Sequence, residues 1–182
     1  MPKFYDSLSD PHREWMGEQH LFFVATAPLD ASGHVNLSPK GYDTFRILDE
    51  NTVAYLDLTG SGIETISHLR ENGRITVMFC AFEGRPRILR LYGTGESLLP
   101  GEDGFDELAP LFPEMPGARA IVRVRVDKIV SSCGYSVPLM SFEDERETLK
   151  EWAERKGDAL AEYRDDRNAE SIDGLPGLVA HS

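Results

Sequence analysis

Cysteine is scarce in this sequence, and its two cysteines have no arrangement that suggests a site. Cys80 and Cys133 lie in separate segments, with neither a C-x-x-C motif nor a Cys/His spacing. The five histidines are scattered in the same way. These absences exclude a disulfide framework and a zinc site of the usual spacing. We therefore expect no metal in this protein.

Long apolar runs and an excess of basic residues are also missing. No run is long enough to span a bilayer, and residues 1–6 lack the basic-then-apolar pattern of a signal peptide, so we expect a cytoplasmic protein with no membrane partner. The 19 basic residues stand against 31 acidic ones, for a net charge of −12. That balance argues against nucleic acid as a partner. A phosphate ligand would need a local cluster of positive charge.

The length and composition are typical of one globular domain. The 182 residues are 41% hydrophobic and 27% charged, with no sign of a disordered or coiled-coil chain. We expect a single domain over residues 1–182. Its core spans residues 20–130, and a C-terminal helix and tail occupy residues 141–182.

A strand, a glycine-rich turn and a helix follow one another in the first half of the chain. Residues 52–58 are mostly apolar and β-branched or aromatic, and residues 59–62, Thr-Gly-Ser-Gly, then break the run. Ile63, Ile66 and Leu69 follow at helical spacing. The first N–H groups of such a helix lack internal partners, which favours an anion beside the two glycines. A turn that only caps the helix is the alternative.

Further strands are expected on both sides of this unit. They cover residues 20–27 and 35–37 as a hairpin, 42–48, 74–82 and 87–98 as a second hairpin, and 121–128. Sequential antiparallel strands with short helices between them predict an α+β, mainly β fold: a six-stranded antiparallel sheet that closes as a barrel.

Three basic residues on these strands are candidates for a ligand site. Lys40 lies in Ser38-Pro39-Lys40-Gly41, where proline and glycine interrupt a strand. Arg87 and Arg90 lie on opposite faces of one strand, each among apolar side chains. For the arginines, the partner is either a carboxylate of the protein or a ligand phosphate. For Lys40, an edge bulge with a solvated side chain is the alternative.

The C-terminal segment has a different character. Ser141 and Asp144 have capping-box spacing, and an apolar stripe on a charged background runs to about Arg167, so the pattern predicts a helix. Gly157 weakens or splits that helix.

Four motifs in this order make the chain similar to a known superfamily. They are residues 35–41, the strand, turn and helix of residues 55–69, residues 71–79 and residues 87–93. Over residues 21–130 the chain resembles the pyridoxamine 5′-phosphate oxidase-like proteins, which are FMN-binding split β-barrels. The charged C-terminal segment resembles a smaller oxidase-like branch of that superfamily.

The resemblance implies a homodimer with FMN at the subunit interface. In the family an Arg-Lys pair at the helix start meets the flavin phosphate, and the matching positions here are Glu64 and Thr65. The family residues that hold pyridoxamine phosphate have no match, so we do not expect that substrate. The candidate FMN contacts are Ser38, Pro39, Lys40, Leu58, Thr59, Gly60, Ser61, Gly62, Thr65, Arg87 and Arg90.

Two functions fit these observations. The first is an FMN-dependent oxidoreductase that acts on a small molecule, with NADH or NADPH as a possible electron donor and no catalytic side chain yet identified. Cys133 would be a redox partner only if it were exposed and its thiol pKa were lowered. The second is a non-catalytic protein of the same fold that binds a flavin, a deazaflavin or haem, or that has lost its ligand altogether.

Overall fold

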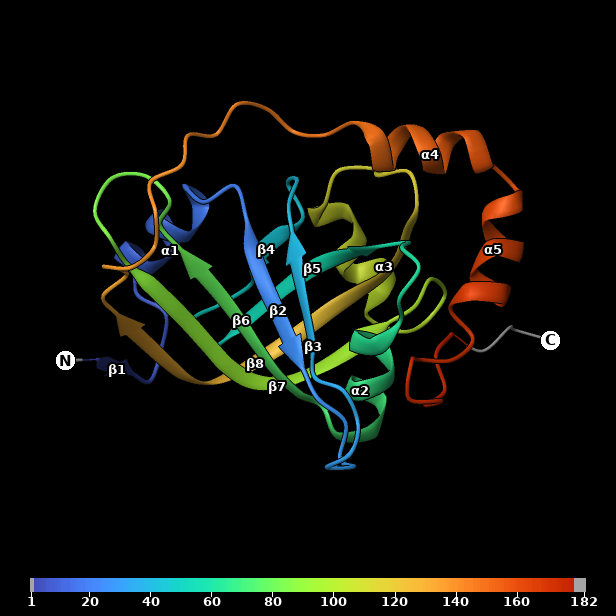
Figure 1. Ribbon diagram of the computed structural model, residues 1–182, viewed down its shortest axis with the longest axis horizontal. Helices are drawn as coiled ribbons and strands as arrows, with labels where there is room; N and C mark the ends of the chain where they lie inside the picture. The colour runs from blue at the N-terminus through green and yellow to red at the C-terminus, as the bar shows by residue number, and fades with distance from the viewer. Residues whose placement is uncertain (1, 179–182) are drawn as a thin grey trace.

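The computed structural model describes residues 2–178, in which eight strands form one curled antiparallel sheet with helices around it (Figure 1). The strands are β1 (Lys3–Tyr5), β2 (Phe22–Thr26), β3 (Asn36–Lys40), β4 (Phe45–Ile47), β5 (Thr52–Leu58), β6 (Arg74–Cys80), β7 (Ile88–Leu98) and β8 (Ala118–Ser132). The helices are α1 (Asp10–Gly17), α2 (Glu64–Asn72), α3 (Phe105–Leu108), α4 (Thr148–Lys156) and α5 (Ala159–Arg167), with a 3-10 turn at Ala109–Leu111.

The sheet curls until its two ends face each other. Its order is β3-β2-β6-β7-β8-β5-β4, and β1 pairs with β8 outside this path. Lys40 of β3 forms an ion pair with Asp57 of β5 at 2.8 Å, although β3 and β5 lie near opposite ends of the sheet. The expected mainly β, antiparallel split-barrel class is therefore confirmed.

The core fills the inside of this curl. Val24, Val77, Leu91 and Ile129 come from neighbouring strands and are all fully buried. Their cross-strand register places them on one face, because side chains alternate between the faces of a strand. Each such side chain contributes about 1.5 to 3 kcal/mol to the free energy of unfolding.

The expected number of six strands is wrong by two. The segment from residue 35 to 48 is two strands, because the turn between β3 and β4 includes Tyr42 in the left-handed region, with φ of 59°. Pro39 lies inside β3 and does not interrupt it, since β3 is an edge strand and needs no donor there. β1, near the N-terminus, is the other strand that the pattern did not predict.

The C-terminal helix begins later than its capping box suggested. Residues 141–147 have no regular structure, and α4 starts only at Thr148. The split at Gly157 is confirmed, since α4 ends there and α5 follows. Figure 1 shows the segment before α4 crossing one end of the sheet and α4 and α5 lying beyond α2 and α3.

Candidate functional site

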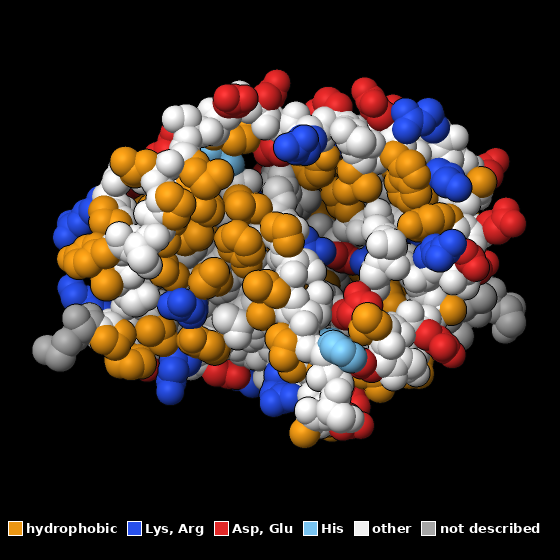
Figure 2. All heavy atoms as spheres, viewed as in Figure 1, with side chains coloured by type: hydrophobic (Ala, Val, Ile, Leu, Met, Phe, Trp, Pro, Cys, Tyr) orange, Lys and Arg blue, Asp and Glu red, His pale blue; other side chains and the backbone are white. Residues whose placement is uncertain are grey.

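A small polar cavity lies where β3, the start of α2 and β8 meet. Its volume is about 160 Å³. Figure 2 shows a hollow between the apolar face of the sheet and the C-terminal helices, with charged groups at its base. The lining residues are Asn36, Ser38, Lys40, Leu58, Gly60, Gly62, Glu64, Thr65 and Arg119. Six of these, all but Asn36, Glu64 and Arg119, are among the candidates expected from the sequence.

β3 contributes three polar side chains because alternate residues of a strand share a face. The Asn36 amide donates to Thr65 Oγ1 at 2.9 Å, and the Ser38 hydroxyl donates to Asn36 Oδ1 at 3.0 Å. Lys40, further along the same face, reaches Asp57. These bonds connect the edge strand to the first turn of α2.

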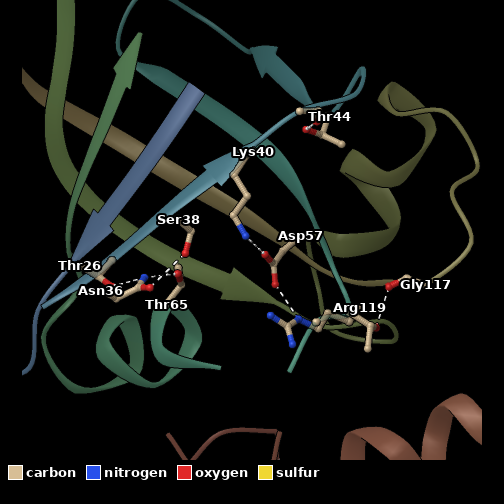
Figure 3. A network of polar contacts seen from close by, with 12 residues as sticks. Thr26, Asn36, Ser38, Lys40, Thr44, Asp57, Thr65, Gly117 and Arg119 are labelled. Atoms are coloured by element: carbon tan, nitrogen blue, oxygen red, sulfur yellow. Dashed lines mark hydrogen bonds and ion pairs between the residues drawn. The ribbon is translucent and has the colours of Figure 1, made fainter. Parts of the chain in front are cut away.

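A buried ion cluster forms the base of the site (Figure 3). Asp57 is fully buried and accepts from Lys40 Nζ at 2.8 Å and from Arg119 Nε at 2.7 Å. Burial alone would raise the pKa of this carboxyl, but the charges and hydrogen bonds of the two cations outweigh it and lower the pKa of Asp57 to about 2. Asp57 therefore stays ionised at neutral pH.

Side chains from α5 and from the residue directly after it contact the same cluster. Arg119 Nη1 donates to Asn168 Oδ1 at 2.9 Å, and the Asn168 amide donates to the Gly60 carbonyl at 3.0 Å. Arg164 donates from Nε to Thr59 Oγ1 at 2.9 Å. Residues just beyond and within α5 thus hold both β8 and the glycine turn.

The start of α2 already has one carboxylate beside it. Glu64 is the first residue of the helix, and its side chain folds back so closely over Gly62 that a Cβ at Gly62 would require the Glu64 carboxylate to shift. Its Oε1 also accepts from the Ile172 backbone N–H at 3.3 Å. A carboxylate at a helix N-terminus is stabilising. Glu64 lines the cavity, so a carboxylate stands at the position for which the family resemblance implied an arginine.

Five of the expected contacts lie outside the cavity. Pro39 lies on the opposite face of β3, Ser61 is exposed on the turn, and buried Thr59 donates to the Gly117 carbonyl. Arg87 lies over the Trp15 ring at 4.6 Å and Arg90 donates to Ser132 at 3.2 Å.

Both arginines and exposed Cys133 belong to the far end of β8 from Arg119. The register pairs Ile88 with Ser132, which places the start of β7 beside the end of β8. Within one copy of the chain, neither arginine contributes to the cavity, so their contact with FMN stays a prediction that requires a second copy.

Sequence reasoning missed Asn36, Arg119 and Asn168. The expected strand began at residue 121, whereas β8 begins at Ala118, so Arg119 fell outside it. Alternation from Ile121 would have placed Arg119 on the charged face with Arg123, so it gave no signal, and in the structure the register of β8 shifts at Arg119. Asn168 follows a charged helix, and no local pattern marks it as functional.

Neither a metal cluster nor a membrane helix is found among residues 2–178. No group of three or more histidine, cysteine, aspartate or glutamate side chains in that range is arranged to hold a metal ion. In the same part of the chain, every helix is too short or too polar to cross a membrane.

Comparison with known proteins gives consistent matches. The family model described as pyridoxamine 5′-phosphate oxidase matches residues 8–133. The Aspergillus flavus protein ustO, described as a pyridoxamine 5′-phosphate oxidase family protein, is 42% identical over 198 residues, which cover 98% of this chain and 78% of that protein.

Solved structures resemble about two thirds of the chain. HupZ of Group A Streptococcus is 25% identical, with a TM-score of 0.51 over 67% of this chain and 91% of that one. A Lactobacillus delbrueckii protein named after the same oxidase has a TM-score of 0.52 at 18% identity, over 69% of this chain and 94% of that one. The second likeness bears on the fold alone.

Proposed function

Because this chain belongs to the pyridoxamine 5′-phosphate oxidase family, we propose that it binds FMN and acts as an FMN-dependent oxidoreductase on a small organic molecule. The observation that carries the proposal is the polar cavity at the start of α2. In a chain with a net charge of −12, this cavity brings together Lys40, Arg119 and the glycine turn. Such a combination suits a phosphate group.

The size of the cavity limits which part of FMN it can hold. Ligand pockets for a whole small molecule usually have a volume of about 300 to 1,000 Å³, whereas this cavity has about 160 Å³. It therefore suits the phosphate end, and the flavin ring would lie outside it. Thr65, Ser38 and the backbone of Gly60 and Gly62 are the further groups that would hold the phosphate.

The protein's part in such a reaction is to bind and orient. FMN, when bound, supplies the hydride and electron transfer. Lys40 lines the cavity, and its ion pair with Asp57 at 2.8 Å fixes its position. Asn36 and Ser38 form a hydrogen-bonded row that is rigidly tied to α2.

We also propose that the outer face of the sheet forms a homodimer interface. Leu37, Ala25 and Tyr92 lie in one cross-strand row on that face, and Leu37 is 64% exposed. Val35, just before β3, is 73% exposed. Figure 2 shows hydrophobic side chains gathered over β2 and β6 on this side. An exposed apolar surface of this kind is typical of a protein interface.

The test is the absorption spectrum of the purified protein, followed by reduction. We expect a yellow protein whose flavin bands bleach with NADH or NADPH and return with an acceptor. A yellow protein that neither donor reduces would support the alternative, a non-catalytic flavin carrier. A colourless protein that FMN cannot reconstitute, or one that takes up a deazaflavin or haem in its place, would contradict the proposal.

A further inference from the structure

We infer that Arg119 binds the phosphate of the ligand, and that the C-terminal helix takes part in the site by positioning Arg119 through Asn168. The inference rests on the proposed function for the identity of the ligand as FMN. The recognition chemistry requires only a phosphate group. It assigns a binding role to a strand residue and to a segment that lies beyond the matched family region, residues 8–133.

The Arg119 side chain is positioned to bind an anion in the cavity. Its side chain is 5% exposed, and it lines the cavity. Nε is bonded to Asp57 and Nη1 to Asn168. Nη2 makes no hydrogen bond with any of residues 2–178. A guanidinium held at two nitrogens, with a third donor free beside a polar cavity, is preorganised for a charge-assisted bond to phosphate.

The charge balance of the cluster also favours an anion. Lys40 and Arg119 carry two positive charges, whereas Asp57 offsets only one of them. Arg164, which donates to the Ala118 carbonyl next to Arg119, adds another positive charge close by. Glu64 opposes an anion, but it is on the α2 wall of the cavity and bonded to Ile172. The β8 side therefore offers the positive charge that Glu64 and Thr65 do not.

Asn168 fixes the direction of the arginine. It is fully buried and makes one bond to Arg119 and another to the Gly60 carbonyl, so it joins β8 to the glycine turn. Without it, the Arg119 guanidinium keeps its bond to Asp57 but loses its second fixed point. Asn168 is thus a positioning residue, and its effect on binding should depend on the phosphate.

The experiment measures Kd for FMN and for riboflavin, which lacks the phosphate, by quenching of flavin fluorescence. Arg119→Gln should weaken FMN by about 30-fold and leave riboflavin unchanged, since a hydrogen bond to a charged group is lost. Asn168→Ala should weaken FMN by a smaller factor, about fivefold, again without effect on riboflavin. Arg123→Gln changes a partly exposed β8 residue that is paired with Glu96; it is the matched control and should change neither affinity.

A second readout separates this inference from the proposed function. Inorganic phosphate should raise the Tm of the wild type and not of Arg119→Gln, because only a protein with a phosphate site is stabilised by it. If the wild type binds phosphate through Arg119 but no flavin, the inference stands and the FMN proposal fails. If FMN binds equally well to the wild type and to Arg119→Gln, the inference is overturned and the FMN proposal stands.

Arg119→Gln leaves Asp57 with one cation and risks unfolding. The double variant Asp57→Asn, Arg119→Gln removes both members of the buried Asp57–Arg119 pair, so neither of these two charges stays buried without the other, and Lys40, which also loses its partner, is partly exposed. If circular dichroism shows this variant folded, it should lose FMN affinity and keep riboflavin affinity as the single variant does. Retained FMN affinity in a folded double variant would refute the role of Arg119.

Discussion

Asp57 is the carboxylate on which the charged cluster depends, and its replacement by asparagine gives a quantitative test. Asp57 is fully buried between Lys40 and Arg119. Asp57→Asn keeps the size of the side chain but removes the negative charge. It also replaces one carboxylate oxygen, which accepts a hydrogen bond from a cation, with an NH2 group, which can only donate. Breaking a buried pair by removal of one partner costs about 3 to 5 kcal/mol. Lys40 is partly exposed, so we expect about 3 kcal/mol at pH 7.

The pH dependence of this loss follows from the pKa of Asp57. The folded pKa, about 2, lies below the ordinary value of 3.8. The folded state therefore binds the proton more weakly, and the resulting stability is fully present above pH 4 and is lost as the pH falls toward 2. A shift of this size corresponds to about 2 kcal/mol in the free energy of unfolding.

Urea unfolding followed by circular dichroism, repeated between pH 7 and pH 2, measures both effects. The difference between wild type and Asp57→Asn should be about 3 kcal/mol at pH 7 and should shrink by about 2 kcal/mol below pH 4. Asp127→Asn, which affects only the exposed pair with Arg125, should cost less than about 1 kcal/mol at every pH. A difference at Asp57 that is small, or that does not change with pH, would refute the cluster as described.

Three further predictions concern the ligand and the assembly. Thr65→Asp and Ser61→Asp should each lower FMN content by like-charge repulsion at the α2 start, with Lys128→Ala on the exposed face of β8 as the unaffected control; full FMN content in both would place the phosphate elsewhere. Glu64→Arg should tighten FMN by about tenfold in a direct titration, and no gain would mean that Glu64 does not oppose the phosphate. The protein should sediment as a dimer at micromolar concentration with a Tm that rises with concentration, whereas a monomer would contradict the proposed interface.

The local elements could be predicted because their signals are local. The glycine turn at residues 59–62 breaks a strand, and Ile63, Ile66 and Leu69 follow at helical spacing and are buried as that spacing requires. Gly157 ends α4 as expected, since it adopts a positive φ of 49°. In each of these cases, the helix or turn is determined by neighbouring residues in the sequence, so the local pattern is enough to predict it.

The site depends on contacts between distant residues, which no local pattern records. Arg119 and Asp57 are 62 residues apart, and Arg119 and Asn168 are 49 apart. They meet only because the sheet curls and α5 packs back against it. The sequence pattern selected Arg87 and Arg90 as phosphate contacts, but strand register places them at the other end of β8. Residue type therefore predicted a basic anion site, and topology places Arg119, not Arg87 or Arg90, on the cavity wall within one copy of the chain.

The central claim is that this protein binds FMN through the FMN phosphate. Isothermal titration of the purified apoprotein with FMN and with riboflavin tests it most directly. The two ligands share the flavin ring and differ only in the phosphate that the cavity is proposed to hold. We predict that FMN binds more tightly than riboflavin by at least about tenfold. Equal affinity for the two, or no heat of binding with either, would contradict the claim.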